Sequence, residues 1–249
     1  MKRKRYYILS LFLCVAMSLF AQERVVENRP YCDLRPLHFG VIVGANLQDM
    51  SLLNCGPHEV LNEDGTTTEY AITCDQDRWD MGFHVGVLGE LRLNQYFAFR
   101  IAPQMYFGNR HLLFRNFSQL GVDGRPAEER QDMKSAYVTC SLDLIYASKR
   151  FNNHRPYVML GLAPAINLTT KSNDILQLKN TDAFFEAGLG CDLYLPFFKL
   201  RPELKFMYSL TNSLNKKHIN DITDPNMIKY ASTVTSARSK MIALTFYFE

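Results

Sequence analysis

The stretch FKLRPELKFMYSL, residues 198–210, alternates apolar and polar side chains along most of its length. Its charged residues all fall on alternate positions, at Lys199, Arg201, Glu203 and Lys205. Successive side chains of a β-strand point to opposite faces, so a strand places all four charges on one face, whereas a helix would scatter them around its circumference. The stretch is therefore predicted to be a strand with one apolar and one charged face.

Seven further segments repeat this pattern, at 37–48, 80–91, 96–107, 137–147, 156–168, 182–195 and 240–249. In the second of these, Phe83 and Val85 alternate with Gly82 and His84. Roughly ten-residue segments with alternating hydrophobicity are typical of transmembrane β-barrels, and about eight strands make the smallest usual barrel. The expected fold is all-β, a transmembrane antiparallel up-and-down barrel of about eight strands.

The connections between these segments alternate in length. Short linkers near 92–95, 148–155 and 196–197 alternate with long loops at 49–79, 108–136, 169–181 and 211–239. Outer-membrane barrels have short periplasmic turns and long extracellular loops. We therefore expect residues 37–249 to form an outer-membrane barrel with both termini in the periplasm. The alternative is a soluble barrel or sandwich, which would bury its apolar face and expose its charges.

The N-terminal residues resemble a secretory signal peptide. Residues 2–5 are basic, residues 8–20 are apolar, and Ala21 is a suitable cleavage position. The apolar run is shorter than the ~20 residues of a spanning helix, although an uncleaved anchor is the alternative. We predict a signal peptide at 1–21 and a periplasmic N-terminal segment at 22–36.

The overall composition argues against nucleic acid as a partner. The formal net charge of +3 includes the basic leader, and no block of basic residues elsewhere is suited to nucleic acid. The mean hydropathy of -0.16 is compatible with a barrel, because only one strand residue in two faces lipid. The expected partners are outer-membrane lipids, with no nucleic acid, and the oligomeric state stays open.

The charged residues predicted to face inward nearly balance. The acids are Glu90, Asp143, Glu186, Asp192 and Glu203, and the bases are Arg100, Lys199, Arg201 and Lys205. A barrel of about eight strands fills its lumen with side chains, so we expect these nine residues to form a structural network, called here the lumen ion network. Glu90 and Arg100 are predicted to pair across the short turn between them. A proton or substrate path lined by the same charges is the alternative.

Catalytic and metal sites lack a diagnostic motif. The side chains considered are His84, Ser141 and Asp143 as a lumen triad, and His58, His111 and His154 in loops. Triads are recognised by geometry, and no Cys or His cluster has zinc-site spacing. We expect no catalytic residue, no cofactor and no metal.

Two cysteines share the first long loop. An oxidising compartment would allow a disulfide between Cys55 and Cys74. Cys140 and Cys191 fall on predicted lipid-facing positions, where they act as small apolar residues. Cys32 would then be left unpaired in the N-terminal segment.

Four stretches carry a family resemblance. They are FGVIVGANLQDM at 39–50, LRLNQYFAFRIAPQMYFG at 91–108, RPYVMLGLAPAINL at 155–168 and LRPELKFMYSL at 200–210. With the long first loop, they make the chain similar to the PorT family, small outer-membrane barrels of Bacteroidetes tied to type IX secretion. The resemblance implies a non-enzymatic component of protein secretion whose partners are other type IX components. The alternatives are an adhesin or structural barrel binding through its loops, and a lipid-modifying enzyme.

Overall fold

The computed structural model describes residues 26–61, 67–120, 124–169, 175–216, 218 and 225–249. The predicted signal peptide at 1–21 lies outside these residues. Of the predicted N-terminal segment, residues 26–36 are described, and they include the short 3-10 helix η1 (Cys32–Leu34).

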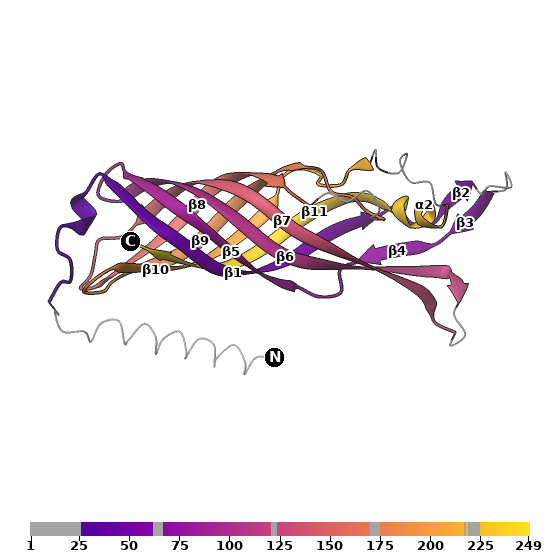
Figure 1. Cartoon of the computed structure of the whole chain (residues 1–249), viewed down its shortest axis with the longest axis horizontal. Coiled ribbons are helices and arrows are strands. Elements are labelled where there is room, and N and C mark those ends of the chain that lie inside the picture. Colours follow the sequence, from indigo (N-terminus) through magenta and orange to yellow (C-terminus); the bar gives the residue numbers. More distant parts are fainter. Residues whose placement is uncertain (1–25, 62–66, 121–123, 170–174, 217, 219–224) are drawn as a thin grey trace, which may run out of the picture.

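Within the described residues, eight long antiparallel strands close into a barrel (Figure 1). They are β1 (Leu37–Asn54), β5 (Asp80–Arg92), β6 (Phe97–Leu120), β7 (Pro126–Ala147), β8 (His154–Asn167), β9 (Thr181–Tyr194), β10 (Lys199–Ser209) and β11 (Val234–Phe248). Each pairs with the next, and β11 pairs with β1 to close the ring, with Val41 opposite Phe248. The predicted all-β, up-and-down barrel is confirmed.

The strands place their apolar side chains outward and their polar side chains inward, the reverse of a soluble barrel. On β10, Leu204 and Phe206 are 54% and 43% exposed, whereas Arg201 and Lys205, on the opposite face of the strand, are buried. The other strands show the same alternation, with apolar side chains outward. An apolar belt this extensive would be an aggregation hazard in water and is stable in a lipid bilayer. The structure therefore has the outward apolar face that a membrane requires.

The end with the short connections is called here the turn end, and the opposite end the loop end. At the loop end, the predicted loop 108–136 is mostly strand, because β6 and β7 stay paired as far as Leu120 and Pro126. The two strands reach well beyond the body of the barrel (Figure 1). The prediction of a long loop was wrong here because, outside the membrane, both faces of a strand meet water or protein, so no apolar–polar alternation marks it.

The predicted loops 49–79 and 211–239 also contain regular structure. Strands β1 and β11 pair along the first part of one and the last part of the other. The remaining elements are β2 (His58–Leu61) paired with β3 (Thr67–Tyr70), β4 (Ile72–Asp75) paired with β6, and the helix α2 (Pro225–Ala231). Among the described residues, no helix is both long enough and apolar enough to cross a membrane.

An apolar core closes the loop end. Its buried members, called here the loop-end core, are Met50, Ile72, Cys74, Leu112, Phe114, Met133, Ile175, Leu176, Leu178, Leu214, Ala231, Val234 and Ala237. On β6, Leu112 and Phe114 continue the inward-facing positions of Arg110, so the polar lumen gives way to an apolar core above it. The loop segments therefore fold back and cover the lumen.

The possible disulfide between Cys55 and Cys74 is not formed, since both are free thiols. Cys55 is exposed, and its thiol donates to the carbonyl of Ser232 at 3.4 Å. Cys74 is buried in the loop-end core, and this burial raises the pKa of its thiol. The two side chains thus occupy different environments, which sequence proximity within one loop does not reveal.

Candidate functional site

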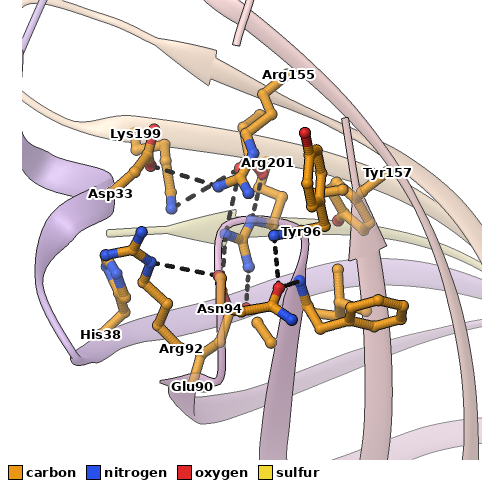
Figure 2. Close-up of a pocket in the computed structure, with 15 residues that line it drawn as sticks. Asp33, His38, Glu90, Arg92, Asn94, Tyr96, Arg155, Tyr157, Lys199 and Arg201 are labelled. Atoms are coloured by element: carbon orange, nitrogen blue, oxygen red, sulfur yellow. Dashed lines mark hydrogen bonds and ion pairs between the residues drawn. The ribbon is translucent and has the colours of Figure 1, made fainter. Parts of the chain in front are cut away.

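Arg201 is the centre of the charged cluster at the turn end. Its Nε donates to Asp192 Oδ1 at 2.5 Å, and its guanidinium also contacts both carboxylate oxygens of Glu90. Lys199 Nζ lies 2.5 Å from Glu249 Oε2, and Arg201 lies 3.3 Å from the other oxygen of that carboxylate. Figure 2 shows Glu90, Lys199 and Arg201 of this cluster pointing toward one another. The arrangement ties β5, β9 and β10 together across the lumen.

Arg100 is the centre of the next cluster along the lumen. It is fully buried, and it donates to Glu203 at 2.8 Å and to Glu90 at 3.4 Å. Two tyrosine hydroxyls, Tyr157 and Tyr247, also donate to Glu203, at 2.7 and 2.8 Å. The guanidinium lies over the ring of Tyr247, 4.3 Å from its centroid. Hydrogen bonds to both charges compensate the loss of water on burial.

Lys205 is surrounded by carboxylates in the middle of the lumen. Its Nζ lies 3.0 Å from Glu186, 3.7 Å from Asp143 and 3.9 Å from Glu203. Ser141 donates to Glu186 at 3.1 Å. A single ammonium group therefore lies among three carboxylates, one of which, Glu203, is also paired with Arg100.

The structure brings together all nine residues of the lumen ion network, and each is at most 6% exposed. Glu90 lies directly opposite Arg100 in the β5–β6 pair, as predicted from their positions on either side of the short turn. Sequence reasoning missed Glu249 as a member, although it follows the inward positions of β11. It also missed the hydroxyls of Tyr157 and Tyr247, whose inward positions were the available signal.

The candidate catalytic residues have other partners. His84 stacks on Tyr106 with ring centroids 4.7 Å apart, and its Nε2 lies 3.0 Å from Thr245 Oγ1. Ser141 is engaged by Glu186, so the described contacts do not assemble the lumen triad. At the loop end, His58 Nε2 lies 2.9 Å from Ser232 Oγ.

The other two loop histidines lie apart from each other. His111 Nδ1 lies 2.6 Å from Asp80, whereas His154 is at the turn end, in a bridge with Phe151. Within the described ranges, no group of three or more His, Cys, Asp or Glu side chains is arranged to hold a metal ion.

Residues 26–36, called here the turn-end plug, cover the mouth of the barrel. Both oxygens of Asp33 accept from the hydroxyl of Tyr194, at 2.8 and 2.7 Å. Arg150 donates to the carbonyls of Asn28 and Arg29, and its guanidinium lies 3.7 Å from the ring centroid of Tyr194. The cavity between Asp33 of the plug and Glu90, Tyr157 and Arg201 of the lumen has a volume of about 20 Å³, which is space for a single water. The plug therefore closes the turn end.

Removing the hydroxyl that holds the plug should expose Cys32. This thiol is partly buried, and burial together with the neighbouring Asp33 carboxylate raises its pKa. A hydrogen bond to a charged group contributes about 1.5–3 kcal/mol, so Tyr194→Phe should speed alkylation of Cys32 by roughly tenfold or more. The measurement is the rate of iodoacetamide labelling, resolved by peptide mass spectrometry. Cys55, exposed at the other end, is the internal control, and an equal acceleration there would contradict local opening.

A comparison with known protein families agrees with the barrel fold. A family model described as "Outer membrane protein beta-barrel domain" matches residues 20–215. The solved structure of Neisserial surface protein A is 13% identical, with a TM-score of 0.41 over 86% of this chain and 98% of that chain. Outer membrane protein OprG from Pseudomonas aeruginosa is 13% identical, with a TM-score of 0.47 over 84% and 93% of the two chains. No curated protein matches the sequence.

A further similar structure is that of Ail, the attachment invasion locus protein of Yersinia pestis, solved with the heparin analogue sucrose octasulfate. It is 11% identical, with a TM-score of 0.37 over 84% of this chain and 96% of that chain. The family model matches well over half of the present sequence, from before the first strand to beyond β10. The chain therefore belongs to the outer membrane protein β-barrel domain family, whose members are proteins of the outer membrane.

Proposed function

We propose that this chain is a non-enzymatic outer-membrane component of type IX protein secretion that acts by contact with other components. The observation that carries the proposal is the filled lumen. The ion network occupies its interior, the loop-end core covers one end and the turn-end plug the other. A barrel filled in this way does not conduct a protein, so a role in secretion requires contacts on its outer surfaces.

The secretion role itself rests on the resemblance to PorT. The stretches that carry this resemblance lie in β1, the β5–β6 hairpin, β8 and β10, and they include four of the nine residues of the lumen ion network. We place the turn end in the periplasm, because barrels of this kind have short periplasmic turns. Exposed aromatics at the turn end, including Phe97, Tyr146 and Phe151, support an interfacial position for it. The partners would then be other type IX components.

One observation favours an adhesin as the second candidate. Strands β6 and β7 project beyond the barrel as a paired extension, and Phe117 on it is 51% exposed. Such an extension would present a rigid surface to another cell or molecule. It would lie outside the cell in the orientation proposed above.

A deletion strain complemented with variants separates the two functions. Under the secretion proposal, deletion traps cargo proteins in the periplasm, and both the intact gene and the Phe117→Ser variant restore their export. Normal export after deletion would overturn the proposal. If the purified barrel then bound cells and Phe117→Ser reduced that binding, the adhesin function would be favoured, whereas altered lipid A would favour a lipid-modifying enzyme.

A further inference from the structure

We propose that a basic hollow at the turn end binds the phosphate of an anionic phospholipid. The hollow, called here the turn-end hollow, has a volume of about 340 Å³. Its charged lining is Arg92, Lys149, Arg150, Arg155 and Asp33. The plug, the end of β5, the turn between β7 and β8, and the start of β8 contribute these residues. This site is independent of the secretion role proposed above.

The hollow carries an excess of positive charge. Four cations line it against one carboxylate, and that carboxylate already accepts from the hydroxyl of Tyr194. Arg155 lies 3.8 Å from Asp33, so the two charges partly offset each other. Three cations remain without an acid in the lining. The hollow therefore has the charge that attracts an anion.

The arginines are held in place by neutral acceptors. Arg92 donates to the carbonyl of Leu34 at 3.3 Å, and Arg155 donates to the carbonyls of Ser148 and Gln95 at 2.9 and 2.8 Å. A carbonyl fixes the direction of a guanidinium without cancelling its charge. The positive groups are thus ordered before a ligand arrives, which lowers the cost of binding. Guanidinium groups are well suited to phosphate oxygens.

Lys149 is the cation that is free to meet a ligand. Its side chain is exposed, and its ammonium makes no hydrogen bond or ion pair with any residue that the structure describes. It lies on the turn between β7 and β8, beside Arg150. Removing this charge should therefore weaken anion binding without disturbing the plug.

Neighbouring aromatics select a lipid phosphate over free phosphate. Phe151, two residues from Lys149, is 52% exposed. Phe97 and Tyr146, next to the adjoining turn, are also exposed, with ring centroids 5.2 Å apart. Exposed aromatic rings of membrane proteins gather at the level of the lipid headgroups. The hollow thus lies where phospholipid phosphates are concentrated.

Native mass spectrometry of the full chain tests the proposal. The protein is purified in detergent micelles containing equal amounts of dioleoylphosphatidylglycerol and dioleoylphosphatidylcholine. We expect preferential retention of the phosphatidylglycerol, and a loss of about fivefold in that preference for Lys149→Gln, from the contribution of one cation near an anionic surface. The matched control is Lys134→Gln, an exposed lysine on β7 at the loop end, which should retain the preference.

Three results would overturn the site. Equal retention of the two lipids would show that the hollow does not select an anionic headgroup. Equal preferences in the Lys149→Gln and Lys134→Gln variants would place any lipid contact elsewhere. Displacement of the lipid by an equal concentration of inorganic phosphate would identify free phosphate as the ligand. The heat-dependent gel shift of each variant checks that its barrel is folded.

Discussion

Replacing Lys205 with methionine is expected to destabilise the barrel by about 3–5 kcal/mol, the usual cost of leaving buried charges without their partner. Lys205 is fully buried and is the ammonium nearest to Glu186 and Asp143. Methionine fills a similar volume but leaves both carboxylates in a lumen closed to water. The free energy of unfolding should be measured by urea titration in lipid vesicles, with the gel shift of the folded band as the signal.

Neutralising the two carboxylates left without a partner should recover much of the lost free energy of unfolding. A triple variant, Lys205→Met with Glu186→Gln and Asp143→Asn, removes the unpaired charges while retaining the shape of the side chains. The control is Lys240→Met, since Lys240 is partly exposed and lies 3.7 Å from Asp49 in a pair that should contribute less than about 1 kcal/mol. A Lys205→Met barrel as stable as this control would contradict a structural role for the buried lysine.

Replacing Arg201 with leucine is expected to lower the free energy of unfolding by a similar amount, about 3–5 kcal/mol. The guanidinium contacts Glu90 from β5 and Asp192 from β9, and it lies 3.3 Å from Glu249. Leucine supplies none of these hydrogen bonds, so Asp192 and Glu249 would share Lys199, and Glu90 would keep only its 3.4 Å contact with Arg100. Urea unfolding of the reconstituted barrel measures the change.

A double-mutant cycle isolates the contact between Arg201 and Glu90. Directly contacting charged residues show coupling energies of about 0.5–3 kcal/mol, so Arg201→Leu and Glu90→Gln together should cost less than the sum of the two single changes. Strict additivity would mean that the pair contributes nothing specific to the fold. An unchanged urea midpoint for Arg201→Leu would argue against the whole turn-end cluster.

The sequence by itself determined the barrel and the contents of its lumen. Alternation along 198–210 and the seven related segments separates lipid-facing from inward-facing positions, because a transmembrane strand meets hydrocarbon on one side and a packed polar interior on the other. The same alternation placed all nine members of the lumen ion network on inward-facing positions and put Glu90 opposite Arg100. These features are local and periodic, so they can be read from neighbouring residues.

Only the tertiary structure decided how the two ends of the barrel are closed. The bond between Asp33 and Tyr194 joins residues 161 positions apart, and the loop-end core gathers side chains from β1, β4, β6, β7, α2 and β11. The extension of β6 and β7 and the separate environments of Cys55 and Cys74 also emerged only there. Outside the bilayer, the two faces of a strand do not meet hydrocarbon on one side and a polar lumen on the other, so the sequence there lacks a regular apolar–polar alternation. The structure of the two ends therefore depends on long-range packing.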